Sequence, residues 1–200
     1  VGNMDPYATV DASTKSITPA SGQSTFIYTL YKATTMYFQA TDITPAHGSA
    51  WTSSISSLLT ASPKPATNLL LVMPGETATP GSGAPGKSGT PSIQIAGSTF
   101  TVTAYVTDDY FNPVVNHNAE DLKVFSSDLY DTEPPAQTFL NGQANAIYTM
   151  TLRTAATTHT LVVVDQNQFD AGTTWVASTA PVTGSFTVEP GAAYQLATLV

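Results

Sequence analysis

Apolar and polar residues alternate with a period of two along several short stretches of the chain. In Phe100–Thr107 the residues Phe, Val, Ala and Val interleave with Thr and Tyr, and a similar alternation covers Ile147–Leu152. A continuous apolar run lies within His159–Asp165, and Ser185–Glu189 alternates again. We find no convincing helical pattern with apolar residues at positions i, i+3, i+4 and i+7. The pattern therefore predicts an all-β fold built from short strands.

Turn-forming pairs separate these stretches at short intervals: Asn112-Pro113, Asn141-Gly142, Ala171-Gly172 and Pro190-Gly191. Many short strands at such spacing are typical of an antiparallel β-sandwich. The segment Pro74–Pro91 differs, because it is dense in Pro and Gly and holds almost no apolar residue. We expect an extended loop or linker there rather than part of the core.

The chain also aligns with itself. Gly22-Gln23 falls on Gly142-Gln143, and Ile27–Leu30 then falls on Ile147–Met150. The series continues in order: Asp5 with Asp128, Lys32 with Arg153, Trp51 with Trp175, Pro63 with Pro190 and Leu69 with Leu196. The matched Trp are the two Trp of the chain. An ordered series of this kind indicates a tandem repeat of sandwich-sized units.

The repeat divides the chain unequally. Residues 74–200 form one complete repeat, which includes the Pro/Gly-rich segment 74–91, whereas residues 1–73 align only with its second part. The part without a counterpart is Pro74–Lys123, which contains the Phe100–Val106 strand. A sandwich without such a strand has an open core and an unpaired edge.

Three sources can close the first repeat: upstream residues of a longer chain, a strand added by another subunit, or residues 1–73 themselves as a smaller sheet. We predict that strands outside 1–73 complete it, because the apolar burial lost with a central strand is comparable with the stability of a small domain. The expected partners are adjoining repeats or copies of the chain, joined head to tail by strand complementation.

Composition excludes several classes of protein. Cys is absent, which excludes disulfides and thiolate metal sites. Six Lys and Arg against 14 acidic residues give a net charge of -8, which does not suit a nucleic-acid binder. No apolar run has the length of a membrane helix, and no signal peptide is visible. Because the chain starts at Val1, we expect a mature or internal portion of a longer product.

The order of motifs in the complete repeat resembles a known family. The strand Phe100–Asp108 ends in an Asp, Asn112-Pro113 follows, Asn141–Ala144 opens a Thr-rich strand, and His159–Asp165 forms an apolar strand. This order is similar to that of the bacterial immunoglobulin-like repeats of invasin- and intimin-type surface proteins. The resemblance covers residues 69–200 directly and 1–68 through the repeat, and the long segment 74–91 departs from it. It implies tandem antiparallel immunoglobulin-like β-sandwiches, outside the cell or at its surface, in a structural or adhesive role.

Residues suited to catalysis are few. The chain has three His, of which His159 begins an apolar strand while His47 and His117 lie among polar loop residues. None has partners at the spacing of a triad or a zinc site. The acidic pairs Asp108-Asp109 and Glu120-Asp121 are adjacent residues, which point to opposite faces of a strand. We therefore predict no enzyme activity, no catalytic residue and no cofactor.

Two loops space oxygen ligands in a way that suits Ca²⁺, namely Asp165–Asp170 and Asn116–Asp121. Neither has the Gly and distal Glu of a full calcium loop, and the counterpart of the first, Asp42–His47, has lost the later acids. We therefore predict no metal site.

Lys123 is close in sequence to Asn116, Asn118 and Glu120, which are the residue types of an isopeptide crosslink. An exposed charge at the end of a strand is the favoured interpretation.

Two functions stay open. The first is a structural subunit or segment of an extracellular bacterial filament, stalk or sheath built from immunoglobulin-like domains. The alternative is a cell-surface adhesin module that binds a receptor or glycan, for which Tyr110 and Phe111 are candidate loop-tip aromatics. The repeat and the scarcity of catalytic residues favour the structural role.

Overall fold

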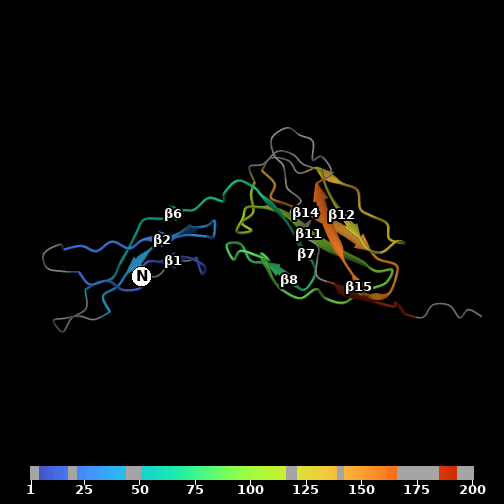
Figure 1. Ribbon diagram of the computed structural model, residues 1–200, viewed down its shortest axis with the longest axis horizontal. Coiled ribbons are helices and arrows are strands. Elements are labelled where there is room, and N and C mark those ends of the chain that lie inside the picture. The colour runs from blue at the N-terminus through green and yellow to red at the C-terminus, as the bar shows by residue number, and fades with distance from the viewer. Residues whose placement is uncertain are drawn as a thin grey trace, which may run out of the picture.

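The computed structural model describes residues 5–17, 22–43, 51–115, 121–138, 142–165 and 185–192. These residues form strands and no helix, which confirms the all-β class. The molecule is elongated, with two lobes along its long axis (Figure 1). We call residues 5–66 the first half and residues 67–192 the second unit. Within the described part of the chain, no helix is long and apolar enough to cross a membrane.

The second unit has one layer of three antiparallel strands. Its central strand, β11 (Thr99–Thr107), pairs with β14 (Asn145–Thr151) on one side and with β7 (Asn68–Val72) on the other. The apolar residues of β11 that the alternation predicts to face the core are all buried: Phe100, Val102, Ala104 and Val106. The long strand expected at this place is therefore confirmed.

A second layer begins with β12 (Asp121–Ser126), which pairs antiparallel with β13 (Gln137–Thr138) and with β16 (Leu161–Asp165). The core of the second unit holds apolar side chains from both layers, among them Val102, Tyr148 and Met150 from the first and Leu122, Val124 and Val163 from the second.

A further three-stranded sheet adjoins this one through the connection between β15 and β16. Thr160 alone separates β16 from β15 (Ala156–His159), and β15 pairs antiparallel with β17 (Phe186–Glu189). β17 also pairs with β10 (Gln94–Ile95), and this pairing is parallel. The two sheets thus have the strand orders β13, β12, β16 and β10, β17, β15, and the chain passes from one to the other at Thr160.

The Pro/Gly-rich segment is a hairpin, which corrects the expectation of an extended loop or linker. β8 (Glu76–Ala78) pairs antiparallel with β9 (Lys87–Gly89). The Nζ of Lys87 lies 2.8 Å from Glu76 Oε2 and 2.9 Å from the carbonyl oxygen of Leu71, which ties the hairpin to β7. The low apolar content misled the prediction, because an ion pair and backbone bonds hold this hairpin instead of a core.

The first half consists of three two-stranded ladders with strands of two residues each. The pairs are β1 (Thr9–Val10) with β2 (Tyr28–Thr29), β3 (Thr35–Met36) with β6 (Leu59–Thr60), and β4 (Gln39–Ala40) with β5 (Ser54–Ile55). Among the described apolar residues of this half, Met36 is the one that is buried.

The boundary expected between residues 73 and 74 would place β7 in the first repeat. In the structure β7 pairs with β11, and Leu71 and Met73 join the core of the second unit. The strand is thus the first strand of the second unit. The alignment compares residues along the chain and contains no information on which sheet a strand joins.

Candidate functional site

Of the three His, the structure describes His159, at the end of β15, which is buried. Its Nε2 lies 2.7 Å from the carbonyl oxygen of Thr154, so Nε2 carries the hydrogen and donates it. Its Nδ1 lies 3.2 Å from the hydroxyl of Ser127. The ring therefore joins the loop after β12 to the loop after β14. His47 and His117 lie outside the described residues.

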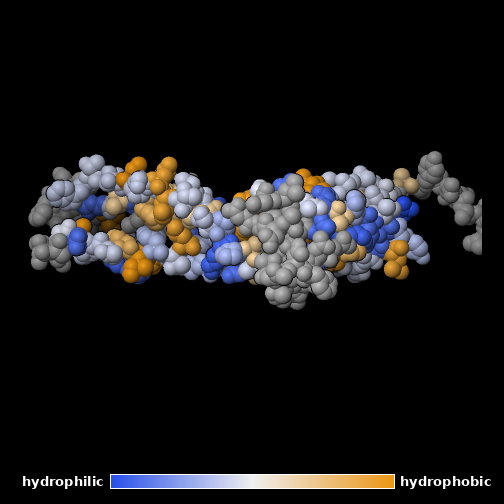
Figure 2. All heavy atoms as spheres, turned by 90° about the horizontal axis from the view of Figure 1, so that it is seen from above, coloured by the Kyte–Doolittle hydropathy of each residue, from blue (hydrophilic) through white to orange (hydrophobic). Residues whose placement is uncertain are grey.

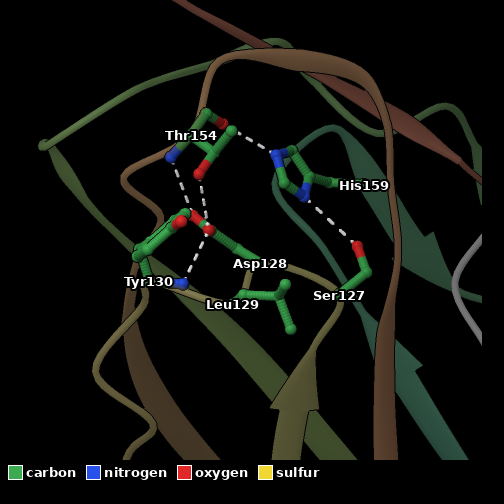
Figure 3. A pocket seen from close by; sticks show the side chains of 6 residues that line it. All are labelled: Ser127, Asp128, Leu129, Tyr130, Thr154 and His159. Carbon is green, nitrogen blue, oxygen red and sulfur yellow. Dashed lines mark hydrogen bonds between the residues drawn. The ribbon is translucent and has the colours of Figure 1, made fainter.

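Ser127 and His159 line a pocket of about 170 Å³, into which Figure 3 looks. A Ser hydroxyl that donates to a neutral imidazole is one requirement of a nucleophile. Here the Ser127 hydroxyl also accepts the Thr160 amide at 3.0 Å. The amides of Tyr130 and Thr154 bind the carboxylate of Asp128 and are not available to hold an oxyanion. The arrangement locks the two loops together.

Asp128 is the centre of this lock. Its carboxylate accepts four hydrogen bonds, from the amides of Tyr130 (3.0 Å), Arg153 (2.6 Å) and Thr154 (2.8 Å) and from the Thr154 hydroxyl (2.7 Å). Figure 3 shows those from Tyr130 and Thr154. Burial alone would raise the pKa of Asp128, but these bonds, those from Thr154 foremost, outweigh it and hold the pKa well below its usual value of 3.8.

Asp5 repeats this arrangement in the first half. Its carboxylate accepts the amides of Tyr7 (2.9 Å), Tyr31 (2.7 Å) and Lys32 (2.9 Å), and it is 3% exposed. Burial again opposes the effect, yet the bonds from Lys32 and Tyr31 lower the pKa of Asp5 below 3.8. Each of the two Asp thus binds the amide two residues later and two consecutive amides that follow the second strand after it, β2 for Asp5 and β14 for Asp128. By these bonds Tyr31 corresponds to Arg153, whereas the sequence alignment pairs Lys32 with Arg153.

A third buried Asp organises the turn Asp108–Asn112, which we call the junction turn. Asp108 Oδ1 accepts the amides of Tyr110 at 2.9 Å and Asn112 at 3.0 Å. Its Oδ2 accepts the amide of Lys64, from the linker that precedes β7, at 3.0 Å. Asp108 is 1% exposed, so these bonds satisfy a carboxylate that would otherwise be costly to bury.

Asn112 connects the junction turn to the first half. Its Nδ2 donates to the carbonyl oxygen of Tyr31 at 2.8 Å, and its Oδ1 accepts the amide of Ala33 at 2.8 Å. Since Asp5 holds the amides of Tyr31 and Lys32, side chains from the two lobes together hold four backbone groups of three consecutive residues. The two lobes therefore meet through directed hydrogen bonds to the backbone.

Aromatic and charged side chains surround these bonds. The rings of Tyr31 and Tyr110 lie 4.8 Å apart, and Lys64 Nζ lies 4.8 Å from the Tyr110 ring. Asp109 lies 3.7 Å from Lys64 Nζ, in an exposed ion pair. Gly81 at the hairpin tip approaches Lys32 so closely that an added Cβ would lie 2.8 Å from its Cα.

The aromatics proposed for an adhesin loop have partners inside the molecule. Tyr110 contacts Tyr31 and Lys64, while Phe111 packs on Gly86, where an added Cβ would lie 2.1 Å from the ring. Phe111 has a φ of 58°, a left-handed conformation that a bulky residue seldom adopts. Its ring contact and the bonds to Asp108 on either side of it fix this conformation.

Few residues of the calcium and crosslink candidates lie within the described part of the chain. The described part of the chain contains no group of three or more His, Asp or Glu that could hold a metal ion. Lys123 pairs with Glu133 at 3.1 Å and lies 4.5 Å from the Phe125 ring. The other residues named for these sites lie outside the described residues: Asn116, Asn118, Glu120 and the segment 166–170, as do the repeat markers Trp175 and Leu196.

The roles of the three buried Asp, Asp5, Asp108 and Asp128, were not predicted from the sequence, although a signal for them is present. Each begins an Asp-x-Tyr triplet, at 5–7, 108–110 and 128–130, and in each the Tyr amide binds the Asp carboxylate. The bridging role of Asn112 has no such signal, because its partners lie about 80 residues earlier, at separations of 79 and 81.

Comparisons with protein-family models, with curated proteins and with solved structures find no match to this chain.

Proposed function

We propose that this chain is a segment of an extracellular bacterial filament, stalk or sheath whose units are immunoglobulin-like β-sandwiches in tandem. The observation that carries the proposal is the bridge from Asn112 to the backbone of Tyr31 and Ala33. Independent domains on a flexible linker make no such contacts. A filament that must carry tension is stiffer when its units are fixed end to end. The extracellular setting rests on the resemblance to surface-protein repeats.

The strand order of the second unit supports the immunoglobulin-like part of the proposal. One layer has the order β7, β11, β14, which corresponds to strands A, B and E of an immunoglobulin domain. In the other layer β12, β15/β16 and β17 correspond to C, F and G. The parallel pairing of β10 with β17 suits a first strand that crosses to the opposite layer, as in variable-type domains.

The first half supports completion by strands of an adjoining unit. Tyr148 and Met150 are fully buried in β14, where they lie opposite Val102 and Phe100 of β11. Their counterparts Tyr28 and Leu30 are only half-buried. The first half also carries many exposed apolar side chains, including Ile17, Ile27, Ile55, Leu58 and Trp51. Figure 2 shows hydrophobic side chains on the surface of this lobe. We infer that an adjoining unit provides the counterparts of β7 and β11.

The chain contains no native Cys, so spin labels on introduced Cys can measure the fixed arrangement directly. Thr29 and Thr149 occupy matched exposed positions in the two lobes. We expect a narrow distance distribution between labels at these sites. Asn112→Ala should broaden the distribution, because the bridge is lost. Asn145→Ala, at an exposed residue of β14, should leave it unchanged.

Electron micrographs of the purified chain test the filament itself. Ordered rods or fibres would support the proposal. Monodisperse particles that bind a glycan array would contradict it in favour of the adhesin, and a broad label distribution in the unmodified chain would remove its main support.

A further inference from the structure

We propose that the far end of the second unit, at the backbone of Arg153–Ala155, is a docking site for the junction turn of another unit of the same kind. We call this end the distal pole and define it as residues 127–130 and 152–155. The inference rests on the proposed function and adds to it the specific surface and the specific partner.

The template is the junction that the molecule already contains. There the segment Tyr31–Ala33 is held from one side by Asp5 and from the other by Asn112. Asp5 binds the amides of Tyr31 and Lys32, which leaves the carbonyl of Tyr31 and the amide of Ala33 to face the junction turn. Asn112 satisfies both groups with its single amide side chain.

At the distal pole, the corresponding segment is held by an Asp in the same way. Asp128 binds the amides of Arg153 and Thr154, as Asp5 binds those of Tyr31 and Lys32. By this match, Ala155 stands where Ala33 stands. The groups that correspond to the two partners of Asn112 are therefore the carbonyl of Arg153 and the amide of Ala155.

These two groups are available. Within the part of the chain that the structure describes, neither the Arg153 carbonyl nor the Ala155 amide makes a hydrogen bond. Arg153, Thr154 and Ala155 are all exposed, whereas Tyr31, Lys32 and Ala33 are half-buried beneath the junction turn. Two exposed aromatic and apolar neighbours, Tyr130 at 72% and Leu129 at 93%, lie beside them.

The register of β11 places the distal pole opposite the junction. Thr99 pairs with Thr151 and Tyr105 pairs with Asn145, so residues after 151 lie at the end of β11 that is remote from Asp108. Figure 1 shows the first half at the other end of the second unit. A contact at the distal pole that copies the first junction is therefore head to tail, and it adds units in one direction.

The chemistry of the pole suits the junction turn. The turn brings an Asn that has one donor and one acceptor group, which matches one carbonyl and one amide. It also brings the ring of Tyr110, which Lys64 approaches in the existing junction. At the distal pole Arg153 takes the place of Tyr31, and a guanidinium binds well on a Tyr ring.

An extended chain tests the proposal. Because Ala66 aligns with Ala193, a copy of residues 66–200 can replace residues 193–200 and continue directly from Ala192. Residue-resolved amide hydrogen exchange then compares three alanines: Ala33 at the existing junction, Ala155 of the second unit at the new one, and Ala155 of the added unit at the free end.

We expect the amide of Ala155 in the second unit to exchange at least about five-fold more slowly in the extended chain than in the original, as one added hydrogen bond implies. Ala155 of the added unit should stay fast. Asn112→Ala in the added unit should abolish the slowing. As a second measurement on the extended chain, labels at the two copies of Thr149 should give a narrow distance distribution.

Two failures are distinguishable. If Ala33 is protected but Ala155 of the second unit exchanges equally fast in both chains, the docking site is wrong and the proposed function stands. If Ala33 itself exchanges freely in the original chain, the existing junction does not hold and the proposed function loses its basis. A Thr149 pair with a broad distance distribution also overturns the docking site.

Discussion

At the scale of single residues, the molecule depends on buried carboxylates that bind backbone amides. Asp128 shows why this works: a short side chain with two acceptor atoms satisfies donors from two loops at once. Each donor would otherwise be a backbone amide left without a partner where a loop closes. Loss of the charge of Asp128 should therefore reduce stability more than a change in a surface loop usually does.

We predict that Asp128→Asn lowers the free energy of unfolding of the second unit by about 2 kcal/mol at neutral pH, because an amide cannot accept four bonds as a carboxylate does. Since the folded pKa is below the usual 3.8, the stabilisation is complete above that pH and is lost as the pH falls toward the folded pKa. Urea unfolding at about pH 7 and about pH 3 should show the difference between the two proteins shrink in acid.

Asp131→Asn is the matched control, because the Asp131 carboxylate accepts one bond, from the Ser126 hydroxyl. It should cost under about 1 kcal/mol. An Asp128→Asn variant with the stability of this control at both pH values would contradict the role assigned to Asp128.

Substitutions at two glycines of the hairpin distinguish the cost of backbone strain from the cost of a steric clash. Gly83 and Gly86 have similar φ values of 71° and 75°, but an added Cβ meets nothing within 4 Å at Gly83 and the Phe111 ring at Gly86. We predict that Gly83→Ala costs about 1 kcal/mol and Gly86→Ala about 2–4 kcal/mol in thermal or urea unfolding. Equal costs would show that the hairpin does not pack on the junction turn.

At the scale of elements, alternation alone predicted β11 and β14, because their buried and exposed faces follow the period of two. The hairpin β8–β9 was out of reach for a physical reason. Its residues are polar on both faces, and its position depends on Lys87 contacting Glu76 and Leu71 rather than on apolar burial. Composition gives the content of apolar residues and does not predict an ion pair that forms only in the folded chain.

We predict that Lys87→Ala destabilises the second unit by about 2–4 kcal/mol, because it leaves the Glu76 carboxylate, 5% exposed, without its cation. Lys64→Ala is the control: its ion pair with Asp109 is more than half exposed, and its loss should cost under about 1 kcal/mol. Chemical unfolding of the two variants measures both. Similar costs would place the Lys87 pair among ordinary surface ion pairs.

At the scale of the whole molecule, the sequence indicated a repeat but not how its units touch. The alignment matched Asp5 with Asp128 by position, and only the fold shows that both hold the start of the same segment. Asn112 looked like a turn residue beside Pro113, and its partners in the first half become neighbours only through the tertiary structure. The chemistry of the junction is therefore long-range, whereas the strands are local.

The unequal cores of the two lobes predict two unfolding transitions. The second unit buries a contiguous core across two layers, whereas the described apolar residues of the first half include one that is buried, Met36. The hydrogen bonds of the junction link the lobes but add little apolar burial, so they do not make the lobes unfold as one. We expect the first half to melt at a lower temperature than the second unit in calorimetry.

Paired substitutions assign the transitions. Met36→Ala should lower only the first transition, and Val124→Ala, in the core of the second unit, should lower only the second. Each removes a fully buried side chain, with a cost of about 1–5 kcal/mol for its own lobe. A single transition that both substitutions shift would mean that the first half is stabilised by the second unit as one cooperative core. That result would remove the reason for expecting an adjoining unit to complete the first half.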